Sequence, residues 1–311
     1  MELEQAIGDY LDWLATTRTM SAHTLRAYRG DLAAATREIG SATAVETLNT
    51  EALLAFIAAQ RERGLAASTV RRRASALRGF CGWLNRMGEL AGDPWRDAGI
   101  SIRQPKRLPR PARSDSVRRL MTSLCQAADV SRVTVPVGPF TRPFQANTLV
   151  AVALMLATGI RVGEVTALRC HDFDAEARSL RVTGKGARER HVYVSGWVVG
   201  LIRAQIKTRR MLEVEHNLLL FNRCGGVMSS AAVRARMRGA ARSADTNAHI
   251  TPHMLRHTTA TQLVDRGVDI RFVQRLLGHA SLTTTEQYTQ VNDATLRRVV
   301  TEADLVGQAL R

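Results

Sequence analysis

The segment from Gly88 to Arg113 interrupts an otherwise helical pattern, and it constrains the fold more than any other feature of the sequence. Two kinds of residue alternate in it: the prolines Pro94, Pro105, Pro109 and Pro111, and the basic residues Arg103, Lys106, Arg107, Arg110 and Arg113. Prolines keep such a stretch extended. A chain of 311 residues is also longer than one small hydrophobic core usually holds. We therefore expect two domains, residues 1–88 and 114–311, joined by a basic linker over residues 89–113.

The charge of the chain narrows the choice of partner. It has 44 Lys plus Arg against 28 Asp plus Glu, a formal net charge of +16, and the basic residues are spread along its whole length. This excess favours a polyanion such as nucleic acid. A merely solubilising surface or a protein of the membrane surface would also be basic.

Several other classes of protein are not indicated. No apolar run approaches the roughly 18 residues of a membrane span. The acidic, amphipathic start MELEQAIGDYLDWL lacks the features of a secretory signal, so we expect a cytoplasmic protein associated with the nucleoid. The four cysteines form no C-x-x-C pair, which favours reduced thiols over disulfides or a zinc site: Cys81, Cys125, Cys170 and Cys224.

The first domain reads as a small helical bundle. Four stretches carry apolar residues at helical spacing between polar caps: Leu3–Arg18, Ser21–Arg37, Thr50–Arg63 and Ala66–Met87. Consecutive arginines in the last stretch point to successive helix faces, so at most one or two of Arg71, Arg72 and Arg73 can meet the same groove. For each arginine, phosphate contact and a solvated face both remain open.

The stretch Thr251–Gln290 concentrates residues of chemical interest. A helix that starts at Thr251 and Pro252 places His253, Arg256 and His257 on one face, because their spacings are three and four residues. A second helix follows, around Asp269–Leu277. A cation and two imidazoles therefore point the same way.

The end of that second helix sets up a further pair of residues. It stops at Gly278, which suits the left-handed position after a helix, so His279 leaves at a fixed exit. Tyr288 follows nine residues later on a last short helix. Two interpretations of this tyrosine stay open: a half-buried phenol with a hydrogen-bonded neighbour, or a nucleophile whose phenolate and phosphate adduct are stabilised by arginines.

Matching residues occur upstream. The segment LATGIRVGEVTAL places Arg161 at a Gly-marked turn entering a helix, with Glu164 one helical turn on to orient its guanidinium. The segment SLRVTGKGARERHVYVS reads as two alternating strands around a Gly-Lys-Gly turn, which puts Lys185 at the tip of a β-hairpin.

Together these motifs resemble the tyrosine recombinase, or phage integrase, family. That family combines an arginine in a T-G-x-R-x-x-E context, a lysine on a β-hairpin, an H-x-x-R pair, a later G-H and a tyrosine nine residues after it. All six positions are occupied in order, by Arg161, Lys185, His253, Arg256, His279 and Tyr288. The resemblance is strong from about Ser114 to the end. It is looser in the first domain, where SAHTLRAYRGDL and AASTVRRRASALRGFCGWL are similar to the family's core-binding domain.

The resemblance implies a fold and a reaction. The fold would be mainly α-helical, with a small β-sheet in the second domain. A four-helix, SAM-like core-binding domain and an α+β catalytic domain would form a C-shaped clamp on DNA. Tyr288 would attack the scissile phosphate, giving a 3′-phosphotyrosine and a free 5′-hydroxyl, and strand exchange would pass through a Holliday junction. No metal and no nucleotide cofactor is implied.

The resemblance also suggests roles for the site residues. Arg161 and Arg256 would bind the phosphate oxygens, and Lys185 would protonate the leaving oxygen. His253 would accept the phenol proton and His279 would donate to a non-bridging oxygen, although these two tasks are interchangeable at the level of sequence. His257 and Glu164 would aim Arg256 and Arg161.

The implied partners are double-stranded DNA with inverted-repeat core sites and further copies of the chain, up to a tetramer, with accessory DNA-bending or partner recombinase proteins as further possibilities. The candidate DNA contacts are Arg26, Arg71, Arg72, Arg73, Arg78, Lys106, Arg107, Arg234, Arg236 and Arg238. The tail Val291–Arg311 reads as one amphipathic helix, which either packs into the neighbouring subunit as an exchange helix or docks on its own domain.

Three other activities compete with this interpretation. A zinc enzyme would use the spacing of His253 and His257, but Met254 stands where a metalloprotease needs Glu, and Arg256 would repel a cation. A catalytically inactive DNA-binding protein would not need all six residues, and a type IB topoisomerase would share their chemistry.

The biological role has two interpretations. The long segment Val130–Ala146, with three prolines, departs from the short connection usual in Xer resolvases. It therefore favours integration, excision or transposition of a mobile element over Xer-like resolution of replicon dimers.

Overall fold

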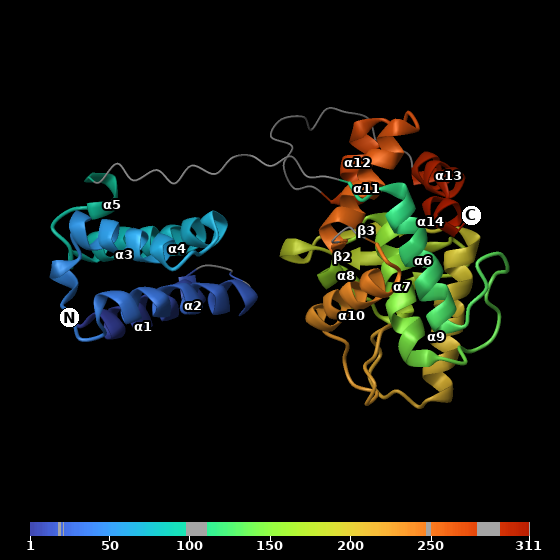
Figure 1. The fold of residues 1–311 in the computed structure, drawn as a ribbon, viewed down its shortest axis with the longest axis horizontal. Helices are drawn as coiled ribbons and strands as arrows, with labels where there is room; N and C mark the ends of the chain where they lie inside the picture. The colour runs from blue at the N-terminus through green and yellow to red at the C-terminus, as the bar shows by residue number, and fades with distance from the viewer. Residues whose placement is uncertain (18–19, 21, 98–110, 247–249, 279–292, 311) are drawn as a thin grey trace. The chain divides into compact units, whose positions relative to one another are not determined.

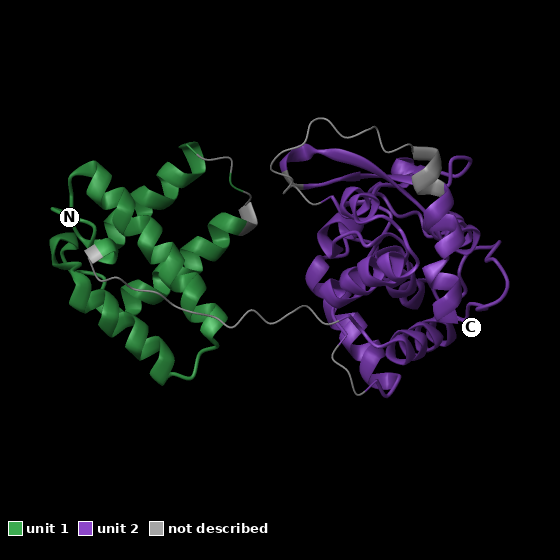
Figure 2. Ribbon diagram, turned by 90° about the horizontal axis from the view of Figure 1, so that it is seen from above, with its two compact units in different colours: residues 1–107 green, residues 108–311 purple. Residues whose placement is uncertain are grey.

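The computed structural model describes residues 1–17, 20, 22–97, 111–246, 250–278 and 293–310. The chain divides into two compact units, unit 1 with residues 1–107 and unit 2 with residues 108–311 (Figure 2). Both are mainly helical, and unit 2 contains a small antiparallel sheet. The mainly helical fold with a small sheet in the second domain is thus confirmed.

Unit 1 is built on four helices, α1 (Leu3–Thr17), α2 (Ala22–Ile39), α3 (Thr50–Glu62) and α4 (Ala67–Met87) (Figure 1). The side chain of Asn49 caps α3 by accepting a 3.0 Å hydrogen bond from the Ala52 N–H. Gly88, with φ of 80°, ends α4 in the left-handed conformation. The apolar faces of the helices meet in one core that includes Phe56 and Phe80. The predicted four-helix bundle is confirmed.

The extended linker expected over residues 89–113 is wrong at both of its ends. A short helix α5 (Pro94–Asp97) lies inside it, and Leu90 and Trp95 are buried in the core of unit 1. Pro94 is compatible with a helix because the first turn needs no hydrogen bond from its nitrogen. At the other end, Ala112 is buried in unit 2, and its N–H donates to Thr258 Oγ1 at 2.8 Å.

Helix α7 (Pro143–Thr158) is the central element of unit 2. Every residue from Ala146 to Thr158 is buried, since the helix is apolar on all sides and other helices surround it. The surrounding helices are α6 (Ser114–Ala128), α9 (Gly196–Met211), α10 (Ser230–Ser243) and α11 (Pro252–Asp265). Gly159, with φ of 66°, ends α7, and the short α8 (Val162–Ala167) follows directly.

The sheet of unit 2 has three antiparallel strands in the order β1 (Phe173–Asp174), β2 (Ser179–Thr183) and β3 (Glu189–Tyr193). The β2–β3 hairpin matches the prediction, and its turn is a 3₁₀ segment, η3 (Lys185–Ala187). The pairing places Val182 opposite Arg190. The sequence did not indicate β1, because two residues show no alternation.

The segment before α7 lies along α9. The Trp197 indole N–H donates to the Ser131 carbonyl at 3.3 Å, the Lys207 ammonium donates to the Val137 carbonyl at 2.8 Å, and the Phe140 N–H donates to Thr208 Oγ1 at 2.7 Å. These bonds hold the proline-rich loop against its own domain.

The tail is two helices, α13 (Asp293–Ala303) and α14 (Leu305–Leu310), and the expectation of a single helix is wrong. The break falls at Asp304, whose φ is 33°. Leu305, Val306 and Leu310 are buried, and α14 packs on α6 and α7. Of the two docking modes left open, this chain adopts the one on its own domain.

None of the helices in the described ranges is both long and apolar enough to span a bilayer. All four cysteines are free, and burial raises the pKa of Cys81 and of Cys125 to about 12. Both thiols therefore stay protonated and unreactive at neutral pH.

Candidate active site

Arg161 stands at the start of α8, where a carboxylate fixes it. Glu164 accepts a 2.7 Å hydrogen bond from the Arg161 N–H and a 3.0 Å hydrogen bond from Arg161 Nη1. The Glu164 side chain is 7% exposed, whereas that of Arg161 is 48% exposed. The buried carboxylate thus anchors a guanidinium whose remaining N–H groups face outward.

Arg256 reaches the same region from α11. Its side chain is buried, and it donates from Nη1 to the Gly159 carbonyl at 2.7 Å and from Nη2 to the Leu277 carbonyl at 2.8 Å. Burial lowers the pKa of Arg256 to about 10, and the nearby positive charge of Arg161 acts in the same direction. The guanidinium is still charged at neutral pH. Two neighbouring cations that each disfavour the other's charge would be stabilised by a bound anion.

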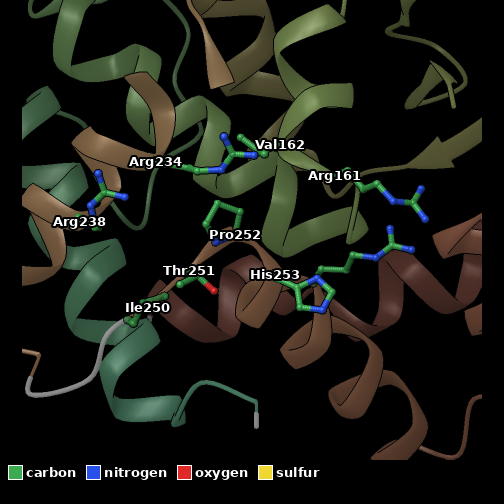
Figure 3. A pocket seen from close by; sticks show the side chains of 9 residues that line it. Arg161, Val162, Arg234, Arg238, Ile250, Thr251, Pro252 and His253 are labelled. Carbon is green, nitrogen blue, oxygen red and sulfur yellow. The ribbon is translucent and has the colours of Figure 1, made fainter. Parts of the chain in front are cut away.

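A cavity of about 370 Å³ opens between these residues (Figure 3). Its lining combines cations with apolar surface: Arg161, Val162, Arg234, Arg238, Ile250, Thr251, Pro252, His253 and Arg256. No acidic side chain belongs to this lining, all of which lies in described parts of the chain. Converging guanidinium donors in a partly apolar cavity are suited to a phosphate group.

The start of α11 places His253 at this cavity. Thr251 caps the helix by accepting a 3.2 Å hydrogen bond from the Met254 N–H, and Pro252 occupies the first helical position. His253 is exposed in the first turn. His257 is half-buried, and no hydrogen bond between described residues joins it to Arg256. The expectation that His257 aims Arg256 is wrong, because two backbone carbonyls do so.

Three of the predicted site residues are not described in full. Lys185 begins the turn between β2 and β3, but its side chain lies outside the described part of the structure. His279 and Tyr288 lie outside the described residues altogether. The structure therefore brings together Arg161, His253 and Arg256 among the six, with Glu164 behind Arg161.

The arginines of α10 divide into two groups. Arg234 and Arg238 line the cavity. Arg236 points into the domain instead and donates from Nη1 to the Phe144 carbonyl at 2.7 Å. Burial lowers its pKa, and the nearby Arg223 lowers it further. The prediction that Arg236 contacts DNA is therefore wrong, since its side chain anchors α10 to the start of α7.

The arginines of unit 1 divide in the same way. Arg72 forms an ion pair with Asp31, and Arg73 donates to the buried Gln60, so both side chains join helices of the bundle. Burial raises the pKa of Asp31 in spite of both arginines. The side chains of Arg26, Arg71 and Arg78 are exposed and remain candidate DNA contacts. Lys106 and Arg107 lie outside the described residues.

One site residue was missed from the sequence. Arg190, on β3, donates from Nη1 and Nη2 to the two carboxylate oxygens of Glu164, at 3.1 and 2.9 Å. No local spacing signals this contact, because 26 residues separate the partners. In the described ranges, no three His, Cys, Asp or Glu side chains gather as metal ligands would.

Comparisons with known proteins agree with this geometry. The model of the phage integrase family matches residues 113–295, and the model of the phage integrase N-terminal SAM-like domain matches residues 7–88. The tyrosine recombinase XerC of Xylella fastidiosa strain 9a5c is 33% identical over 96% of each chain. The tyrosine recombinase XerC of Mycobacterium tuberculosis strain H37Ra is 35% identical over 95% of this chain and 97% of its own.

Solved structures share the fold. A lambda integrase dimer bound to a core site superposes with a TM-score of 0.70 at 18% identity, and covers 94% of this chain and 100% of that one. The integrase of the transposon Tn1549, in complex with a circular intermediate DNA, gives a TM-score of 0.69 at 14% identity over 90% and 92% of the two chains. Two family models that each match one unit, and relatives similar over nearly the whole length, establish the assignment. The chain belongs to the phage integrase family and is a tyrosine recombinase, a DNA strand-exchange enzyme.

Proposed function

We propose that the cavity between α8, α10 and α11 holds the scissile phosphate and that Tyr288 attacks it. One observation carries this proposal: Arg161, Arg256 and His253 line a single cavity that no acidic side chain of its lining enters. Arg256 uses two of its five N–H donors on backbone carbonyls, and Arg161 uses one on Glu164. The donors that remain bind the non-bridging oxygens and stabilise the charge of the pentavalent transition state.

The choice of nucleophile is supported by elimination. The sequence has four tyrosines. Tyr10 and Tyr193 are buried in the cores of units 1 and 2, and Tyr28 belongs to α2 of the bundle. Tyr288 is the tyrosine that follows the site helices in the sequence. Its phenol oxygen forms the bond to phosphorus as the bond from phosphorus to the 5′-oxygen breaks.

Two protons move in this step, and each has a proposed carrier. Lys185, in the turn of the β-hairpin, protonates the departing 5′-oxygen. His253, at the mouth of the cavity, accepts the phenol proton, and His279 donates to a non-bridging oxygen. A 5′-hydroxyl of a second duplex then reverses the step, since the 3′-phosphotyrosine conserves the energy of the broken bond. The proposal requires neither a metal nor a nucleotide.

The proposed partners are DNA duplexes with inverted-repeat core sites and three further copies of the chain. Solved relatives support this assembly: lambda integrase has been seen as a dimer bound to a core site and as a tetramer bound to a Holliday junction. Accessory DNA-bending or partner recombinase proteins would assist, and the reaction would take place on cytoplasmic DNA.

We propose a mobile element as the substrate, for integration, excision or transposition. The proline-rich loop before α7 supports this role, since its bonds to α9 make it a built part of the domain. Resolution of replicon dimers is the second candidate, because XerC proteins are similar over nearly the whole chain. Sequencing the junctions formed in cells separates the two: ends of a mobile element support the first role, and a single chromosomal site supports the second.

The chemistry is tested with target DNA that carries a nick near the cleavage position. The wild-type enzyme should form a protein–DNA adduct that survives SDS, and Y288F should form none while it still binds the DNA. Y28F, which alters a tyrosine in the bundle, should form the adduct at the wild-type rate. An adduct from Y288F would refute the assigned nucleophile, and loss of the wild-type adduct on adding a chelator would refute the metal-free chemistry.

A further inference from the structure

Arg190 makes three hydrogen bonds to two separate parts of the site. Its Nη1 and Nη2 bind the carboxylate of Glu164 at 3.1 and 2.9 Å, and its Nε donates to the Leu276 carbonyl at 3.0 Å. Its side chain is 14% exposed. The bidentate contact fixes the plane of the guanidinium, and the third bond fixes its edge. Arg190 thus ties β3 both to the start of α8 and to the end of α12 (Ile270–Leu277).

Two glycines make room for this guanidinium. A Cβ at Gly278 would lie 3.1 Å from Arg190 Cζ and Nε, and Gly278 has the left-handed φ of 66° that ends α12. A Cβ at Gly184 would lie 3.5 Å from Arg190 Nη1 and 3.6 Å from Glu164 Oε1. The backbone on both sides of Arg190 therefore lies against it.

These neighbours adjoin the residues that carry the chemistry. Gly184 immediately precedes Lys185, and Gly278 immediately precedes His279. Glu164 is the anchor of Arg161. The carbonyls of Leu276 and Leu277 are consecutive, and Arg190 binds the first while Arg256 binds the second. One buried guanidinium thus contacts the supports of four proposed site residues.

We infer that Arg190 is a positioning residue that sets the relative placement of Arg161, the Lys185 turn and the His279 exit for strand cleavage. The inference rests on the proposed function. Arg190 acts through Glu164 and through the backbone at Gly184 and Gly278, and it does not touch the DNA. A displacement of about 1 Å at a reacting group costs on the order of 100-fold in rate, so a support of this kind controls cleavage more than binding.

Glu164 provides a signature that a purely structural ion pair would not give. Burial favours the neutral acid, but the hydrogen bonds from Arg190 and from the Arg161 N–H outweigh it and hold the pKa of Glu164 below its ordinary value. The charged groups that face Glu164 are Arg161 on its own segment, Arg190 on β3 and Arg256 on α11. Removal of Arg190 leaves burial less opposed, so the pKa of Glu164 rises. Its protonated form no longer holds Arg161 as an ion pair.

The test measures single-turnover adduct formation on the nicked DNA, binding to the intact duplex, and urea unfolding. We expect R190M to slow adduct formation about 100-fold while duplex affinity changes far less. We also expect R190K to slow it, because one ammonium cannot span Glu164 and the Leu276 carbonyl together. R181M is the matched control: Arg181 lies on the neighbouring strand β2 and pairs with Asp172 at 3.1 Å, away from the cavity, so its rate should equal that of the wild type.

The pH profile separates positioning from general destabilisation. The adduct rate of R190M should fall more steeply than that of the wild type as the pH is lowered below neutrality, and E164Q combined with R190M should remove this extra dependence. If R190M fails to fold, R190K decides the question on the same measurements. A wild-type rate from R190M or R190K, or a pH profile of R190M that matches the wild type, would overturn the inference. Failure of the wild-type enzyme to form an adduct would instead overturn the proposed function.

Discussion

Arg256 donates a 2.7 Å hydrogen bond from Nη1 to the backbone carbonyl of Gly159. This contact joins α11 to the C-terminal end of α7, the helix buried at the centre of unit 2. Gly159 also lies two residues before Arg161, so the two arginines of the cavity share one support. The site is consequently built on the most rigid part of its domain, as the precise placement of a phosphate requires.

Replacement of Gly159 by alanine tests this support. Its φ is 66°, and a Cβ would lie 2.4 Å from Leu277 Cδ2. We expect G159A to lower the free energy of unfolding by about 1–3 kcal/mol and to slow adduct formation, since Leu277 and its bond to Arg256 must shift. Urea unfolding and the nicked-DNA assay measure the two effects. G163A is the control: no atom lies within 4 Å of that Cβ, so its stability should not fall.

The ion pair of Glu164 predicts how stability depends on pH. The pKa of Glu164 is lowered in the folded chain from an ordinary value of 4.5, because the bonds from Arg190 and Arg161 outweigh burial. Its contribution is therefore fully present above about pH 4.5 and is lost as the pH falls through the lowered pKa. The difference in free energy of unfolding between wild type and E164Q should be largest near neutral pH and should shrink in acid. A difference that stayed constant down to pH 3 would contradict this assignment.

The two groups of arginines on α10 predict two kinds of phenotype. R234M and R238M should weaken DNA binding and lower the slope of log affinity against log salt by about one for each lost phosphate contact. R236M should leave that slope unchanged. It should lower the free energy of unfolding by about 1–2 kcal/mol, because its bond to the Phe144 carbonyl is lost. Salt titrations and urea unfolding separate the groups, and a reduced slope for R236M would contradict the division.

The docking of α14 predicts the effect of a core substitution in the tail. Leu305 is 4% exposed against α6 and α7, so L305A should lower the free energy of unfolding by about 2–4 kcal/mol. The exposed E302A, in the preceding helix, is the control and should have little effect. The loss should not depend on protein concentration. A stability that rose with concentration would instead place α14 in another copy of the chain.

Local contacts were predictable from the sequence. The pairing of Arg161 with Glu164 follows from a three-residue spacing at a helix start, and the β-hairpin follows from two alternating stretches around Gly-Lys-Gly. The helices of unit 1 follow from their apolar periodicity. Arg236 could have been separated from Arg234 and Arg238 by the same reasoning, since a four-residue spacing places the outer two on one face of α10 and the middle one away from it.

Contacts between distant parts of the chain were not predictable. Arg190 and Leu276 are 86 residues apart, and Ala112 and Thr258 are 146 apart, so both pairs depend on how the elements pack. The break between α13 and α14 depends on the backbone of Asp304, a residue type that usually occurs in ordinary helical or extended conformations. His257 has the spacing to support Arg256, but the carbonyls of Gly159 and Leu277 already occupy that role.

The most direct test of the account is to map the atom that binds DNA. The adduct formed by the wild-type enzyme on nicked DNA is digested with nuclease and protease, and the peptide that carries the residual nucleotide is sequenced by mass spectrometry. The account predicts a single modified peptide with the nucleotide on Tyr288. A nucleotide on Tyr10, Tyr28 or Tyr193, or on a residue other than tyrosine, would contradict it.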